Sequence, residues 1–413
     1  MSDHDALGEL LADGNWPAII EAVAATPELL EARFAWAEQT LLHHAVIAGE
    51  RTAVEALLDL GADVTVRDGA DHATPLHWAA DRGDLGIAKL LVERGGDPNA
   101  GDDVHGWGPL GWATLGDMRE ELARWLLRAG ATPRIFPLIA LDDGPALRDL
   151  LAANPAALNE RMSLWEHYEC PIHYAIGRGA TETFEVLLEA GVDIVSLNWL
   201  GLSPLAVAGF QKRDEFAARL EARGVEPDLS AALAWGAYKS AAAALESEPG
   251  AFVAKARYGR LLMYASENNH VDAVRWLLEN GADPNTVHDW WDNRLTALHP
   301  AGSHGALEAI RALVEGGADT SVRDQQFDGV PLEWARHFEH EAAVEYLVGV
   351  TPDGDPIDLS TLDITQLDLT GVDLSRIEAS SDTPDDEGDS SGQAPDESEP
   401  DDAEPDDARE ESE

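Results

Sequence analysis

The sequence predicts an all-α solenoid of about eleven helix–turn–helix repeats with short β-hairpin fingers. Eight stretches of similar sequence begin at residues 40, 74, 108, 170, 203, 260, 296 and 330. Five of the seven intervals between them lie between 33 and 36 residues, and the other two are long enough for one more degenerate unit each. Self-similarity at such a period is typical of stacked repeats, in which each unit buries its apolar face against its neighbours.

Each repeat carries the local signals of two short antiparallel helices. In "TPLHWAADRGDLGIAKLLVERGGDPNA", Thr74 can cap the first helix, and Pro75 suits its first position because no hydrogen bond is lost there. Gly83 allows the tight break between the helices. The recurring "LL..GAD" then supplies an apolar stripe and a glycine that can adopt the left-handed C-terminal conformation.

The pattern resembles the ankyrin repeat over about residues 7–348. In that family the histidine of "TPLH" ties adjacent repeats together by hydrogen bonds. The matching residues here are His43, His77, His173 and His299, whereas the departures are Gly111, Ala206, Met263 and Glu333. The resemblance therefore implies that the junctions at the four departures are looser or are held in another way.

Three degenerate units, at residues 18–33, 146–161 and 241–257, replace the "GAD.N" turn with a turn that contains proline. They resemble the helix pairs that open many bacterial ankyrin arrays. With the eight clear repeats they make eleven repeats, which group into three modules. The modules are 1–132 with an opener and three repeats, 133–227 with an opener and two, and 228–350 with an opener and three. Hinges near 133–140 and 228–240 are a further prediction.

The pattern changes after the array. Residues 351–379 contain an apolar–Asp–apolar unit that recurs every five residues, which resembles pentapeptide repeats. Because five such units make little more than one turn of a β-helix, we favour an extended segment that caps the last helix pair over a free-standing β-helix. Residues 380–413 are dominated by Pro, Asp, Glu and Ser, so we expect a disordered acidic tail.

The charge of the chain limits its partners. The net charge is −50, and residues 1–350 alone carry 55 acidic and 26 basic side chains. Such a surface repels phosphate backbones and anionic lipid heads, so we expect no direct nucleic-acid or membrane binding. The acidity is compatible with a high-salt cytoplasm, but the sequence does not decide this. One cysteine, no secretion signal and no long apolar segment predict a soluble, cytoplasmic protein.

No motif for catalysis, metal binding or cofactor binding is found, so we expect a non-enzymatic protein without cofactors. His337 and His340 are three residues apart on an expected helix, but two ligands do not make a metal site. Cys170 takes the Thr position of its repeat and has no base partner, which indicates packing and not nucleophilic chemistry.

Aromatic residues form two sets. Trp78, Trp112, Tyr174, Tyr264 and Trp334 recur just after the "PLH" position, which indicates framework. The segments that precede the repeats, the fingers, hold six of the 13 tryptophans together with other aromatic residues. From these we predict a partner-binding set comprising Trp107, Trp165, His167, Tyr168, Trp199, Trp290, Trp291 and Phe327. The alternative is that each ring lies flat on the neighbouring finger and only stabilises the array.

The primary functional hypothesis is therefore a monomeric scaffold that binds a protein or peptide through its concave face and fingers. The acidic surface favours a partner of basic or mixed charge. The alternative hypothesis is an acidic decoy that mimics nucleic acid and occupies a DNA-processing protein.

Overall fold

The computed structural model describes residues 3–34, 37–104, 106–114, 118–162, 169–248, 250–253, 256–290 and 293–351. The chain divides into two units, Met1–Pro352 and Asp353–Glu413, and the described residues all belong to the first. Apart from Thr351, the predicted capping segment 351–379 and acidic tail 380–413 therefore lie outside the described residues. The description below concerns the first unit.

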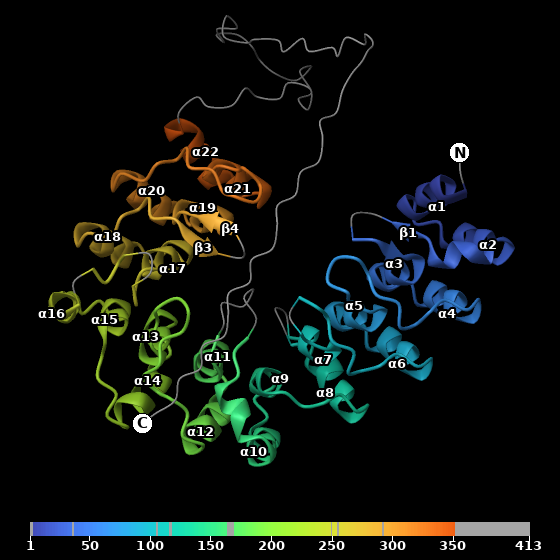
Figure 1. The fold of residues 1–413 in the computed structure, drawn as a ribbon, viewed down its shortest axis with the longest axis horizontal. Helices are drawn as coiled ribbons and strands as arrows, with labels where there is room; N and C mark the ends of the chain where they lie inside the picture. Colours follow the sequence, from blue (N-terminus) through green and yellow to red (C-terminus); the bar gives the residue numbers. More distant parts are fainter. Residues whose placement is uncertain are drawn as a thin grey trace, which may run out of the picture. The chain divides into compact units, whose positions relative to one another are not determined.

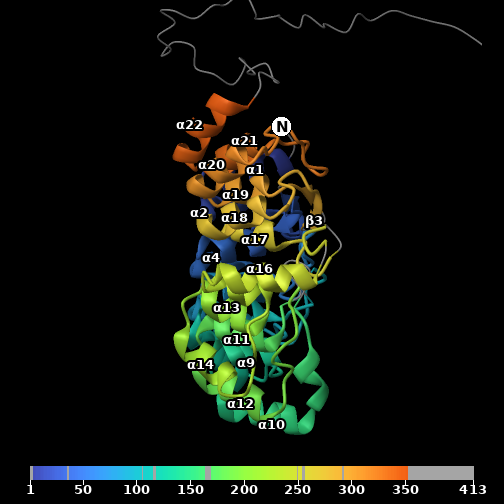
Figure 2. The same ribbon diagram turned by 90° about the vertical axis from the view of Figure 1, so that its left-hand side faces the viewer.

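The described residues form 22 α-helices arranged as eleven antiparallel pairs (Figures 1 and 2). The first helices of the pairs are α1 (Asp3–Ala12), α3 (Leu41–Ala48), α5 (Pro75–Arg82), α7 (Pro109–Trp112), α9 (Ile135–Ala140), α11 (Pro171–Arg178), α13 (Pro204–Phe210), α15 (Leu229–Ala234), α17 (Leu261–Glu267), α19 (Leu298–Ser303) and α21 (Pro331–His337). The second helices are α2 (Trp16–Ala25), α4 (Arg51–Asp59), α6 (Leu85–Glu93), α8 (Glu120–Arg128), α10 (Gly144–Ala153), α12 (Thr181–Glu189), α14 (Asp214–Glu221), α16 (Tyr238–Ser247), α18 (Val271–Glu279), α20 (Leu307–Glu315) and α22 (Glu341–Val350). The all-α repeat fold and its eleven repeats are confirmed.

Two further kinds of element connect the helices. In the first two degenerate units the proline turns are 3₁₀ helices, η1 (Pro27–Glu31) and η2 (Pro155–Asn159). Two fingers are short antiparallel hairpins, as expected. Strand β1 (Arg33–Phe34) pairs with β2 (Gln39–Thr40), and β3 (His288–Trp290) pairs with β4 (Asn293–Leu295).

The "TPLH" motif fixes the start of each first helix that contains it. The Nδ1 atom of His77 accepts the backbone N–H of Thr74 at 3.0 Å, which caps α5. Its Nε2–H donates to the carbonyl of Trp107 in the next finger at 3.2 Å. Burial lowers the pKa of His77, so the ring stays neutral and one nitrogen accepts while the other donates. This one side chain therefore caps its own helix and ties two repeats together.

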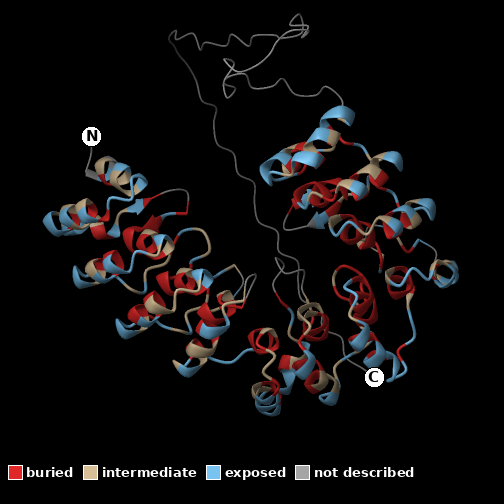
Figure 3. Cartoon of the chain, turned by 180° about the vertical axis from the view of Figure 1, so that it is seen from behind, coloured by how far each residue is buried: buried red, intermediate tan, exposed pale blue. Residues whose placement is uncertain are grey.

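The apolar core is buried between successive helix pairs (Figure 3). Its buried side chains form two clusters, one that extends from Leu7 to Leu141 and one that extends from Trp107 to Leu347. The two clusters meet where α7 precedes α9, and these two helices contact each other sparsely. The core is continuous through residues 228–240. The module boundaries and both hinges stay predictions.

Candidate partner-binding surface

Three tryptophans on first helices are hydrogen-bonded to an aspartate ten residues earlier. The indole Nε1–H donates to a carboxylate oxygen at 2.7–2.9 Å in each of the pairs Trp78–Asp68, Trp112–Asp102 and Trp334–Asp324. Each aspartate is buried and also accepts backbone N–H groups of its own finger. The pairs therefore anchor fingers to helices. Sequence reasoning missed them, although the spacing of Asp and Trp recurs in three repeats.

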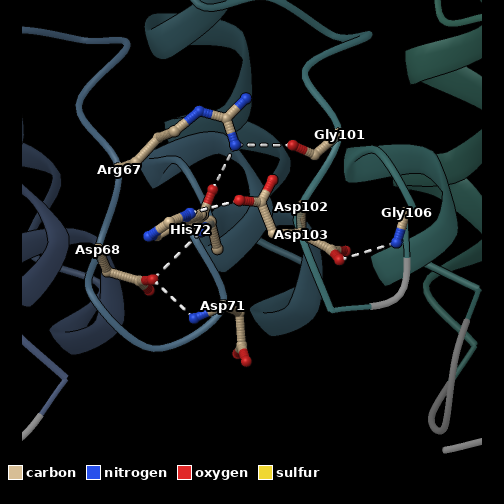
Figure 4. A network of polar contacts seen from close by, with 9 residues as sticks. Arg67, Asp68, Asp71, His72, Gly101, Asp102, Asp103 and Gly106 are labelled. Atoms are coloured by element: carbon tan, nitrogen blue, oxygen red, sulfur yellow. Dashed lines mark hydrogen bonds and ion pairs between the residues drawn. The ribbon is translucent and has the colours of Figure 1, made fainter. Parts of the chain in front are cut away.

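Arginines link neighbouring fingers through their backbone carbonyls. Arg33 donates to the carbonyls of Glu38 and Arg67 at 2.8 and 3.0 Å. Arg67 makes the corresponding bonds one repeat later, to the carbonyls of His72 and Gly101 (Figure 4). Each guanidinium thus holds its own finger and the next one, which positions the fingers relative to one another.

The predicted binding residues fall into different environments. Trp107 is only 6% exposed, and its ring stacks on Phe136 with the centroids 6.2 Å apart. Trp199 is half-buried, with the guanidinium carbon of Arg260 at 4.2 Å from its ring centroid. Phe327, in contrast, is 69% exposed. Trp107 and Trp199 are therefore packed against other parts of the array in this structure, whereas Phe327 is exposed, and a role of any of the three in binding stays a prediction.

The remaining predicted residues lie wholly or partly outside the described part of the chain. Trp290 lies in β3 opposite Asn293, but its side chain is outside the described part of the chain. Trp165, His167, Tyr168 and Trp291 lie entirely outside the described residues. Their role in binding stays a prediction.

An aromatic patch surrounds Phe327 at the last repeat. Phe327 contacts Trp334 edge-on at 6.3 Å between ring centroids, and Trp334 lies 6.4 Å from Phe338. Phe338 is 47% exposed. In an earlier repeat, Trp78 packs against Trp112 of the following first helix at 5.4 Å, but no first helix follows α21 among the described residues. The patch therefore leaves large apolar side chains accessible at a finger and its helix.

A cleft opens between the fourth and fifth repeats, where the two core clusters meet. Its volume is about 190 Å³, and its lining includes the Trp107 ring, Phe136, Arg134 and Arg161. Gly111 occupies the position of the repeat histidine on the cleft wall. A Cβ atom at Gly111 would lie 2.2 Å from the Trp107 ring, so Trp107 fills the space that a side chain would take.

Several titratable groups near the first helices are shifted in pKa by burial or are held by hydrogen bonds. Burial raises the pKa of the Cys170 thiol to about 11, and Arg161 donates to its sulfur at 2.9 Å. Burial also raises the pKa of Glu169 and of Glu267 to about 7. His340, one of the two histidines considered for a metal, is bonded to the carbonyl of Ser303 at 2.8 Å. Among the described residues, no group of three or more metal-ligating side chains is found. Nor is any described helix long and apolar enough to cross a membrane.

The family follows from comparison with known proteins. A family model described as "Ankyrin repeats (3 copies)" matches residues 42–136 and 257–358. The chain is an ankyrin-repeat protein. Ankyrin repeats are protein-interaction modules, and the chain is an interaction scaffold in that general sense. Its matches to curated relatives also fall within the ankyrin repeats.

Three relatives illustrate the extent of the similarity. The E3 ubiquitin-protein ligase KEG of Arabidopsis thaliana is 29% identical over 214 residues, which cover 51% of this chain and 12% of that protein. Palmitoyltransferase ZDHHC13 of Homo sapiens is 29% identical over 177 residues, 41% of this chain and 28% of that protein. Palmitoyltransferase Hip14 of Drosophila melanogaster is 46% identical over 59 residues, 14% of this chain and 9% of that protein. The chain thus matches less than a third of the length of each relative.

Proposed function

We propose that this ankyrin-repeat protein is a non-enzymatic scaffold that binds a protein or peptide through its concave face, formed by the first helices and the fingers. The observation that carries the proposal is the aromatic patch of Phe327, Trp334 and Phe338. The exposed aromatic rings on this finger and its helix present apolar area to water, which a bound partner would cover. Aromatic side chains of this kind contribute much of the binding energy at protein interfaces.

The anchoring of the fingers supports the proposal. The buried aspartates and the arginines that link successive fingers hold the finger backbones before any partner arrives. A surface that is already ordered loses less conformational entropy on binding. The acidic surface favours a partner of basic or mixed charge, because opposite charges accelerate association.

The test compares partner capture by wild type with capture by two variants. One is Phe327→Ser, and the other is Trp290→Ser/Trp291→Ser. We expect each to lose captured proteins, since an aromatic hot spot contributes about 2 kcal/mol or more, which corresponds to roughly 30-fold in affinity. Leu60→Ser is the matched control, because Leu60 is an exposed apolar side chain at the end of α4. Recovery of the same proteins in equal amounts by all four chains would exclude the proposal.

A further inference from the structure

The cleft between the fourth and fifth repeats has features that the proposed function does not use. It lies between the finger and first helix of one repeat and α9 of the next. Six of its lining residues bear on its chemistry, namely Trp107, Gly108, Gly111, Arg134, Phe136 and Arg161. Its volume of about 190 Å³ exceeds the roughly 150 Å³ of a cavity that accommodates benzene, so a whole side chain fits.

Gly111 replaces the repeat histidine on the wall of the cleft. In three other repeats the histidine Nδ1 accepts the backbone N–H three residues earlier, as at His43, His77 and His299. The histidine Nε2–H of two of these also donates to a carbonyl of the next finger. Gly111 supplies neither bond, so the backbone N–H of Gly108 lacks this side-chain acceptor. The Trp107 ring fills the space that the histidine would take, and Gly108, whose N–H this histidine would accept, also lines the cleft.

Two arginines line the cleft, although the chain contains 78 acidic and only 28 basic residues. Among the described residues, no aspartate or glutamate lines it, and Glu160 and Glu169 lie near the two arginines outside the lining. The Nη1–H of Arg134 donates to the carbonyl of Gly106 at 2.7 Å, and its Nη2 lies 4.0 Å from a carboxylate oxygen of Glu160. The Arg134 side chain is 53% exposed, so its guanidinium, with five N–H groups, can also meet a ligand.

The second arginine and the aromatic wall complete the cleft. Arg161 donates to the buried sulfur of Cys170 at 2.9 Å, which holds its guanidinium against the fold. Trp107 and Phe136 are stacked with an interplanar angle of 21° and are both buried. The lining therefore combines a flat apolar surface with guanidinium groups, which bind carboxylates by charge-assisted hydrogen bonds.

We propose that this cleft receives the carboxylate of an aspartate or glutamate side chain in an extended peptide segment of the partner. The stem of that side chain lies on the Trp107 and Phe136 wall, and its carboxylate lies against Arg134 and Arg161. The inference rests on the proposed binding function and adds that the partner is of mixed charge, with an acidic residue at a defined position.

In the experiment, the full-length protein is the immobilised target, and peptides that bind it are selected from a displayed library of random 12-residue peptides. The selected peptides are synthesised, each with a version in which the acidic residue is changed to its amide. Affinities are then measured for wild type, Arg134→Gln, Arg134→Lys and Arg161→Gln, with circular dichroism as a check on folding. Arg148→Gln is the matched control, since Arg148 is a half-exposed arginine on α10 that does not line the cleft.

We expect the selected peptides to share an acidic position whose amide version binds wild type at least tenfold more weakly. Arg134→Gln should cause a similar loss for the acidic peptide and no further loss for the amide version, whereas Arg134→Lys should retain part of the affinity. Arg148→Gln should bind as wild type does. An Arg134→Glu chain that binds a lysine version of the peptide better than the acidic version would support the contact directly.

Four outcomes would overturn the inference. Peptides that bind without a shared acidic residue, or that bind the arginine variants as tightly as wild type, would reject the cleft and leave the proposed function intact. A peptide with the sequence of residues 396–413, which is rich in acidic residues, is the competitor for specificity. If it displaces the selected peptides as well as they displace one another, charge alone accounts for binding. If the library yields no peptide that binds wild type, the proposed function fails as well.

Discussion

Glu267 provides a sharp test of how burial controls the stability of this array. It is the last residue of α17, its side chain is only 10% exposed, and one carboxylate oxygen lies 3.4 Å from Nε2 of His304. Burial raises the pKa of Glu267 from 4.5 to about 7. The charged form is thus disfavoured in the folded protein, and the protonated form is favoured.

The sign and size of the effect follow from this pKa. Because the folded state holds the proton more tightly than the unfolded state, the stabilisation is fully present below pH 4.5 and is lost as the pH rises through about 7. Between pH 5 and pH 8 the free energy of unfolding should fall by about 2–3 kcal/mol through this group. Glu267→Gln removes the ionisation and should therefore stabilise the protein at pH 8 by up to about 3 kcal/mol.

The assay is native-state hydrogen exchange of the amides in α17 and α19 at pH 5 and pH 8, corrected for intrinsic exchange rates. This exchange measures the free energy of local unfolding around each amide. A local measurement is appropriate because repeat arrays need not unfold as one unit. Glu279→Gln, at an exposed position on α18, is the matched control and should leave the pH dependence unchanged. If Glu267→Gln shows the same loss of protection between pH 5 and pH 8 as wild type, the assigned role of burial is wrong.

Three other outcomes follow from contacts described above. His77→Ala removes a helix cap and the hydrogen bond to the Trp107 carbonyl. We therefore expect a destabilisation of about 1–3 kcal/mol and faster amide exchange in the finger that contains Trp107. Unchanged exchange in that finger would contradict the tie between repeats. The Cys170 thiol, with its pKa raised to about 11, should react with iodoacetamide at pH 8 much more slowly in the folded protein than in urea, and equal rates would show that it is accessible. Gly201→Ala should lower the urea midpoint more than Gly191→Ala, by about 1–3 kcal/mol in free energy, because an added Cβ meets a backbone oxygen at 2.6 Å only at Gly201. Both glycines have φ near +81°, so equal losses would mean that backbone strain alone matters.

The repeat register could be predicted from the sequence because its signals are local. Thr74 and Pro75 start a helix and Gly83 adopts φ of 74°, as the sequence predicts. The degenerate unit that opens the array is predicted from the proline turn that it shares with two other units, and that turn is a 3₁₀ helix in the structure. Local chemistry determines these features, so no knowledge of distant contacts is required.

The environments of the finger aromatics could not be predicted in the same way. Trp107 and Phe327 both precede a repeat start, yet the first is buried and the second is exposed. The difference depends on what lies across the junction. Trp107 has Gly111 beneath it and Phe136 in the following repeat, whereas the repeat of Phe327 is the last one among the described residues. Contacts between repeats decide burial, and a single repeat sequence does not contain them.

The four departures from the repeat histidine show where function can be sought in such an array. At Ala206, the hydroxyl of Ser203 caps α13 and bonds to Asp228 in the next unit, which replaces the missing tie. Glu333 accepts the N–H of Val330 as the histidine would.

At the third departure, Met263 is fully buried and α17 packs closely on α19, so apolar contact replaces the hydrogen bonds. At Gly111 the Trp107 ring fills the space of the histidine, but Gly111 supplies neither of the two hydrogen bonds that the histidine would make. Its junction combines a cleft, two arginines and a sparse contact between α7 and α9. Repeat hydrogen bonds that are lost and not replaced lower the stability of the fold. Such a loss persists in proteins chiefly where a functional site requires it. We therefore expect a ligand at the Gly111 junction to restore the contact that this repeat lacks.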